Sequence, residues 1–138
     1  MYAALPAHHR LASRPALTLA ELGEEQWVQT SHSSPCARHV VRSCLSAGFE
    51  PNVSFESDDY ETVQGLVAAG VGVALIPGLA LTRVHPGVVV RELAPRSPAR
   101  SVVAATMADP AVTPATKTMI DVLGEVSALR ADGAPGVG

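Results

Sequence analysis

The stretch that decides the fold is Phe55-Glu-Ser-Asp-Asp-Tyr-Glu-Thr-Val-Gln-Gly-Leu-Val-Ala-Ala-Gly-Val-Gly-Val-Ala-Leu-Ile-Pro77. It begins as a strand, continues as a helix, is interrupted by glycine and ends in a short apolar run that proline closes. Strand, helix and buried strand in this order predict a βαβ unit, whose two strands are parallel. We therefore expect an α/β fold with a mainly parallel, doubly wound sheet. Ligand sites in such folds form at the carboxyl ends of the strands.

The helix inside this stretch carries its own start and stop signals. Asp58 is expected to cap it, and Glu61 three residues later completes a capping box. Gly70 is expected to end the helix in a left-handed conformation, and residues 71–76 then form the buried strand. One helical face carries the apolar side chains, which are Tyr60, Val63, Leu66 and Val67.

A second helix is predicted from Pro35, with Ser34 as its cap, to the residue before Gly48. Its apolar face carries Cys36, Val40, Val41, Cys44 and Leu45. The two cysteines lie about 12 Å apart on a helix, which exceeds the roughly 7 Å that a disulfide bridges. We therefore expect both thiols to be free and buried.

The remaining elements follow from the same kinds of pattern. Strands are expected at residues 2–6, 26–30, 53–57, 88–93 and 101–106, short helical turns at 17–22 and 78–81, and a last helix from Pro114 with Thr113 as its cap. Residues 131–138 have nothing to bury and are expected to form a disordered tail.

Composition narrows the classes of function. The chain has 138 residues, the size of one domain, and 47% of them are hydrophobic, which is enough for a core. A charged fraction of 17% and a net charge of −3 argue against a free-standing nucleic-acid binder. No apolar run reaches the roughly 18 residues of a membrane span, and the start lacks the pattern of a secretory signal. A cytoplasmic protein is the expectation.

Several short runs, in their order and spacing, resemble the effector-binding domain of LysR-type transcriptional regulators. The resemblance extends to about Leu129, and it is carried by Leu5-Pro6, His9-Arg-Leu-Ala12, Leu19-Ala-Glu-Leu22 before Trp27, Gly48-Phe-Glu-Pro51, Phe55-Glu-Ser57 and Leu66-Val-Ala-Ala-Gly-Val-Gly-Val-Ala-Leu-Ile-Pro77. It implies a periplasmic-binding-protein-like (type 2) module of two α/β lobes that two crossing segments join.

By this resemblance, residues 1–6 form a crossing strand and residues 7–95 the second lobe. Residues 96–130 correspond to a strand and helix of the first lobe, and residues 131–138 to the tail. No helix-turn-helix is recognisable, so the resemblance implies a truncated, effector-sensing part that does not bind DNA by itself. It also implies a homodimer or higher oligomer.

Hydroxyl side chains gather immediately before the second helix, at Thr30, Ser31, Ser33 and Ser34. The free N–H groups and the dipole of a helix N-terminus favour an anion there. Capping and turn chemistry also account for these residue types. The resemblance implies that residues 30–36, Cys36 included, face the cleft for small effectors, often carboxylates. Ser57 is a further candidate for effector binding.

Other kinds of site find less support in the sequence. The histidines lack the spacing of a metal site and are expected in solvated loops. Ser33, Ser34 or Cys36 could form a triad with a histidine and an aspartate, but no Gly-x-Ser-x-Gly elbow is present. The glycines do not form a dinucleotide-binding fingerprint. We therefore expect no metal, no cofactor and no catalysis. The alternatives are the solute-binding protein of a transport system, which would need a secretory signal, and a small α/β enzyme.

Overall fold

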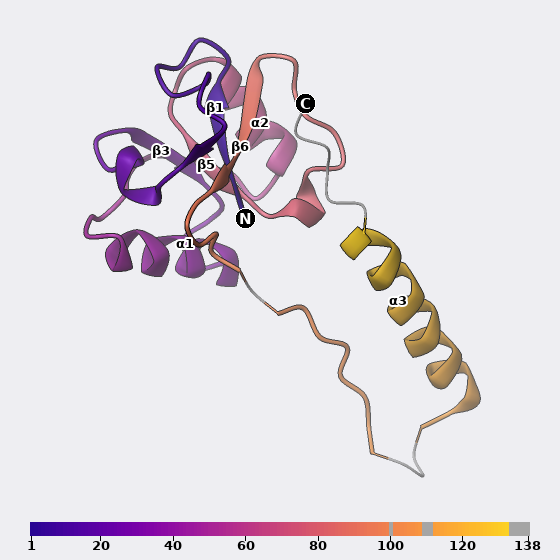
Figure 1. The fold of residues 1–138 in the computed structure, drawn as a ribbon. Coiled ribbons are helices and arrows are strands. Elements are labelled where there is room, and N and C mark those ends of the chain that lie inside the picture. Colours follow the sequence, from indigo (N-terminus) through magenta and orange to yellow (C-terminus); the bar gives the residue numbers. More distant parts are fainter. Residues whose placement is uncertain (100, 109–111, 133–138) are drawn as a thin grey trace. The chain divides into compact units, whose positions relative to one another are not determined.

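The computed structural model describes residues 1–99, 101–108 and 112–132 (Figure 1). The chain divides into two compact units, one formed by Met1–Ala99 and the other by the described residues beyond position 100. Assigning these units to the lobes of an effector domain stays a prediction. None of the helices in the described part is both long and apolar enough to cross a membrane.

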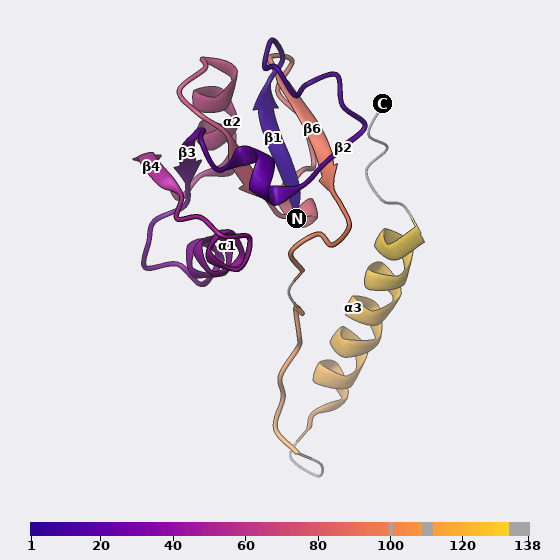
Figure 2. The ribbon, with the colours of Figure 1, turned by 60° about the vertical axis from the view of Figure 1, so that its left-hand side comes forward.

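The first unit is built on two groups of strands (Figure 2). One group has the order β2-β6-β1-β5, and the other pairs β3 with β4. β1 is antiparallel to both of its neighbours, whereas β2 is parallel to β6 and β3 is parallel to β4. The strands are β1 (Tyr2–Pro6), β2 (Ala16–Leu17), β3 (Gln26–Gln29), β4 (Asn52–Glu56), β5 (Ala74–Ile76) and β6 (Val88–Leu93).

Val73, immediately before β5, joins the two groups of strands. Its N–H donates to the carbonyl of Gln26 at 2.8 Å, and its carbonyl accepts from the N–H of Val28 at 2.9 Å. The bridge between Trp27 and Val73 is parallel. Among the described strands of this unit, β1 is therefore the one that runs against the rest. The prediction of an α/β fold with a mainly parallel sheet is confirmed.

The close approach at Gly72 explains why the strand expected at 71–76 is shorter. A Cβ atom at Gly72 would lie 2.5 Å from the carbonyl oxygen of Gln26, well inside contact distance. Val73 makes only an isolated bridge there, and regular pairing with β1 begins at Ala74. The strand is thus Ala74–Ile76.

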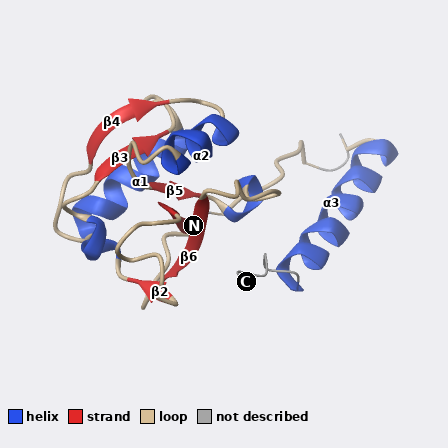
Figure 3. Ribbon diagram, turned by 90° about the horizontal axis from the view of Figure 1, so that it is seen from above, coloured by secondary structure: helices blue, strands red, loops and turns tan. Residues whose placement is uncertain are grey.

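Two helices cover opposite faces of these strands: α1 (Pro35–Ser46) and α2 (Tyr60–Ala68). Successive side chains of a strand point to opposite faces, and β1 divides accordingly. Ala3 and Leu5 belong to the apolar cluster that contains Val40 and Cys44 of α1. Ala4 belongs to the cluster that contains Val63 and Val67 of α2. The result is a three-layer, doubly wound arrangement, and Figure 3 shows its helices and strands from above.

Both helices end as predicted, at glycines with positive φ: Gly48 at 94° and Gly70 at 80°. The start of α2 differs from the prediction. Asp59, not Asp58, is its cap, and its carboxylate accepts hydrogen bonds from the N–H groups of Glu61 and Thr62. Adjacent aspartates offer two starting points one residue apart. Asp59 is the cap because the carboxylate of Asp58 instead accepts the N–H of Ser31.

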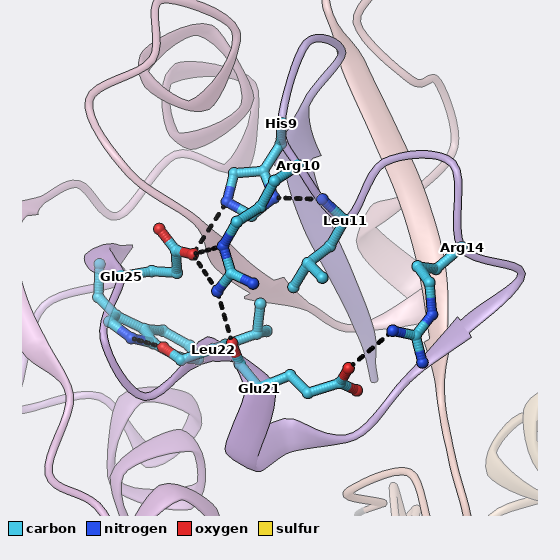
Figure 4. A network of polar contacts seen from close by, with 8 residues as sticks. His9, Arg10, Leu11, Arg14, Glu21, Leu22 and Glu25 are labelled. Carbon is cyan, nitrogen blue, oxygen red and sulfur yellow. Dashed lines mark hydrogen bonds and ion pairs between the residues drawn. The ribbon is translucent and has the colours of Figure 1, made fainter.

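Two other side chains also lie differently from the prediction. Leu45 was expected on the buried face of α1 but is 55% exposed. His9 was expected in a solvated loop, but its side chain is only 11% exposed and its Nε2 lies 3.2 Å from Oε1 of Glu25. Arg10 contacts the same carboxylate oxygen at 2.7 Å (Figure 4). These contacts attach the 7–15 loop to the segment that follows η1 (Leu19–Leu22).

The short turn η2 (Gly78–Ala80) follows β5, and its position agrees with the helical turn expected at 78–81. The helical turn expected at residues 17–22 is shorter than predicted. Leu17 belongs to β2 and pairs with Leu93 in the sheet, and the turn starts only at Leu19.

The second unit contains one helix, α3 (Pro114–Asp132), in its described part. Its start is confirmed, since the N–H of Thr116 donates to Oγ1 of Thr113 at 3.2 Å. The prediction of a strand at residues 101–106 is wrong: these residues form no strand, and the described residues of this unit offer no partner strand. The tail was predicted to begin at 131, but α3 continues to Asp132, and residues 133–138 lie outside the described part.

Replacing Gly72 by alanine should destabilise the first unit by about 2 kcal/mol, since the new methyl group would overlap backbone atoms of β3. Gly65 is the matched control, because a Cβ atom there meets nothing within 4 Å. Gly65→Ala, inside α2, should raise the free energy of unfolding by up to about 1 kcal/mol. Urea unfolding followed by circular dichroism measures both. Equal stability of Gly72→Ala and the parent chain would contradict the close crossing.

Candidate functional site

The segment from Thr30 to Ser34, which we call the hydroxyl loop, connects the carboxyl end of β3 to the start of α1. Its four hydroxyls form two pairs. Oγ1 of Thr30 lies 2.9 Å from Oγ of Ser34, and Oγ of Ser31 lies 3.1 Å from Oγ of Ser33. Oγ of Ser34 also accepts the N–H of Ala37 at 3.0 Å, so it is the cap of α1. The structure thus brings the predicted hydroxyl residues together.

The start of α1 also leaves backbone donors available. Within the part of the chain that the structure describes, the N–H groups of Ser33 and Cys36 donate to no acceptor. Pro35 lies between them at the first position of the helix, where its missing N–H leaves no bond unmade. Free N–H groups at a helix N-terminus attract the oxygen atoms of a carboxylate or hydroxyl ligand.

Two carboxylates, from the end of β4 and the turn after it, accept two further N–H groups of the hydroxyl loop. Oδ1 of Asp58 accepts the N–H of Ser31 at 3.1 Å, and Oε2 of Glu56 accepts the N–H of His32 at 3.2 Å. The hydrogen bond from the His32 backbone is the main cause that lowers the pKa of Glu56 below its usual value. Glu56 is therefore ionised at neutral pH, and its side of the hydroxyl loop is negatively charged.

Cys36 connects the starts of the two helices. The residue is 8% exposed, and its Sγ lies 2.9 Å from the hydroxyl of Tyr60, the first residue of α2. Cys44, two turns further along α1, is fully buried, and burial raises the pKa of its thiol to about 12. Both cysteines are free, as predicted. Cys36 is thus the only cysteine that lies beside the hydroxyl loop.

Ser57 lies next to the hydroxyl loop because β4 is parallel to β3. Its N–H donates to the carbonyl of Gln29 at 3.0 Å, and its hydroxyl accepts the N–H of Asp59 at 3.3 Å. The sequence prediction placed Ser57 near this site but did not include Gln29, Asp58 or Tyr60. The side chain of Gln29 is almost completely buried, and its Oε1 has no partner among the described residues. The polar residue directly after the apolar pair Trp27-Val28 was the available signal for Gln29.

Comparison with known proteins decides the family. The family model for the LysR substrate binding domain matches residues 1–128. The chain belongs to this family. The LysR domain is 36% identical over 77 residues to the transcriptional dual regulator GltC of Bacillus subtilis (strain 168), an alignment that covers 56% of this chain and 26% of GltC. The chain therefore spans about a quarter of that relative.

Solved structures of regulators have the same fold. HinK, a LysR family transcriptional regulator from Pseudomonas aeruginosa, matches with a TM-score of 0.74 and 27% identity, over 87% of this chain and 42% of HinK. The effector binding domain of QuiR, solved in complex with shikimate, matches with a TM-score of 0.71, over 87% of this chain and 57% of that one. At 16% identity the likeness to QuiR shows the fold alone. GltC and HinK are transcriptional regulators, so the transport and enzyme alternatives are not favoured.

Ser34→Ala in the LysR domain should lower the free energy of unfolding by about 1 kcal/mol, because Ala37 loses its hydrogen-bond acceptor at the start of α1. Ser46 is the matched control on the same helix. Its exposed hydroxyl donates a hydrogen bond to the carbonyl of Arg42 in the preceding turn. Ser46→Ala should therefore leave the free energy of unfolding unchanged or raise it slightly. Urea unfolding of both variants is the measurement. Equal effects of the two substitutions would show that Ser34 is not a cap.

Proposed function

We propose that this LysR domain binds a small-molecule effector at the hydroxyl loop and the start of α1. The observation that carries the proposal is the pair of free N–H groups, at Ser33 and Cys36, beside four clustered hydroxyls. Together these groups suit a ligand that offers both a carboxylate and hydroxyl groups. Shikimate, the compound bound by the structural neighbour QuiR, is such a molecule.

The candidate residues for effector binding are those that the sequence predicted: Thr30, Ser31, Ser33, Ser34, Cys36 and Ser57. The proposal adds Asp58 and Tyr60, because each connects the start of α1 to the start of α2. A ligand that contacts the hydroxyl loop would change these two contacts first. An effector acts through the difference between its affinities for two conformations, and this junction is where such a difference would arise.

The charge of Asp58 sets a condition on the effector. Its carboxylate already occupies the N–H of Ser31, so a ligand carboxylate would be repelled if it approached the same group. The free N–H groups of Ser33 and Cys36 are the alternative position for the carboxylate. Hydroxyl groups of the ligand would then donate to the carboxylate of Glu56, which also accepts the N–H of His32. This arrangement favours a hydroxylated acid over a simple carboxylate.

The same proposal covers the wider role of the chain. It acts as the sensing part of a transcriptional regulator in the cytoplasm, without catalysis and without contacting DNA itself. It also forms a homodimer or larger assembly. Two features of the first unit support association: among the described strands β4 pairs only with β3, and Phe55 on β4 is 54% exposed. An unpaired strand edge beside an exposed aromatic side chain favours contact with a second chain.

Titrating the ¹⁵N-labelled chain with shikimate tests the proposal. We expect saturable chemical-shift changes at Ser31, Ser33 and Cys36. Asp58→Asn should tighten binding about fivefold, since the amide oxygen keeps the hydrogen bond to Ser31 while one nearby negative charge is removed. Glu24→Gln, which removes one exposed carboxylate away from the loop, should leave the affinity unchanged.

Two results would count against the proposal. If shikimate and benzoate both leave the amides of residues 30–36 unmoved, the loop is not a carboxylate site. If Asp58→Asn and Glu24→Gln tighten binding equally, the effect is one of net charge and does not locate the ligand.

A further inference from the structure

A hollow of about 620 Å³ lies beside the second half of α1. Three segments form it: the second half of α1, the residues around η1 and the segment that follows β6. We call it the arginine hollow, after the two arginines that line it, Arg42 on α1 and Arg96 after β6. No residue of the hydroxyl loop lines it, so it is separate from the site described above.

The arginine hollow is positively charged, because the described residues that line it include Arg42 and Arg96 but no aspartate or glutamate. Neither guanidinium makes an ion pair or hydrogen bond within the described part of the chain. By contrast, Arg10 and Arg14 are paired with Glu25 and Glu21, at 2.7 and 3.0 Å. In a chain of net charge −3, two unpaired arginines at one concave surface favour an anionic ligand.

The rest of the lining is suited to the body of an organic molecule. Leu19, Ala47 and Pro95 supply apolar surface. His39 also lines the hollow, and its Nε2 is shielded from solvent without a hydrogen-bond partner among the described residues. Ligand sites commonly combine a mainly apolar lining with a few polar groups.

We propose that the arginine hollow binds a small organic carboxylate with an apolar body. The carboxylate lies against the guanidinium groups of Arg42 and Arg96, and the body lies on the apolar surface of Leu19, Ala47 and Pro95. α1 then carries two ligand sites, one at its start and one along its second half. This second site does not depend on the function proposed for the hydroxyl loop.

Benzoate is the probe, because it is a small carboxylate with an apolar body. Titration of the ¹⁵N-labelled chain should produce saturable shifts at the amides of Arg42 and Ser43 and at the side-chain Nε–H of Arg96. Arg42→Gln and Arg96→Gln should each weaken binding roughly tenfold, since each removes one charge-assisted contact. Inorganic phosphate, which has the charge but no apolar body, should bind more weakly than benzoate.

Two control variants test whether benzoate binds at the arginine hollow and not elsewhere on the first unit. Arg83→Gln removes one exposed positive charge elsewhere on the first unit and should change benzoate affinity less than twofold. Ser33→Ala alters the hydroxyl loop and should leave the shifts at Arg42 unchanged. The spectrum of each variant shows whether it is folded.

Several outcomes would overturn the inference. They are benzoate shifts confined to residues 30–36, shifts that do not saturate, equal weakening by Arg83→Gln and Arg42→Gln, or phosphate binding as tight as benzoate binding. Loss of shikimate binding to the hydroxyl loop, with benzoate binding intact, would refute the proposed function and leave the arginine hollow standing.

Discussion

Two hydrogen bonds at Val73 hold the candidate site in place. They connect β5, which is paired with β1 in the interior of the first unit, to β3, whose carboxyl end leads into the hydroxyl loop. β4 pairs with β3 and brings the segment from Glu56 to Asp58 beside the same loop. The position of every candidate residue therefore depends on a crossing that only Gly72 allows, since a Cβ atom there would overlap the backbone of Gln26.

Local signals in the sequence predicted the elements whose ends are fixed by neighbouring residues. Ser34 and Pro35 marked the start of α1, and the positive φ angles of Gly48 and Gly70 mark the helix ends that the sequence placed there. These features depend on side chains within a few residues of the helix end. For the same reason, the clustering of the hydroxyls before α1 could be read directly from the sequence.

The predictions failed where contacts between distant residues decide the outcome. Asp58 and Asp59 are equivalent caps by local chemistry, and the bond from the Ser31 N–H to Asp58 separates their roles. The apolar run at 101–106 has the composition of a strand, but a strand needs a neighbour, and the described residues of its unit supply none. Tyr60 was missed because nothing near it in the sequence indicates that the start of α2 meets the start of α1.

The charges around α1 differ along its length. Carboxylates of Glu56 and Asp58 lie beside the hydroxyl loop at its start, whereas Arg42 and Arg96 line the hollow along its second half. A ligand at the start of α1 must therefore suit acidic neighbours, while the charged side chains among the described residues that line the hollow are both positive. This contrast separates the two sites by the chemistry of the ligand that each would accept.

Amide hydrogen exchange in the absence of ligand tests the central claim, that the crossing at Val73 makes the site part of one cooperative core. The N–H groups of Val28 and Val73 both donate across or beside this crossing. We predict that both exchange only through global unfolding, with opening free energies equal to the free energy of unfolding from urea denaturation. Opening free energies several kcal/mol lower at these two amides, with Leu5 of β1 still fully protected, would show that β3 and the hydroxyl loop open independently and would contradict the account.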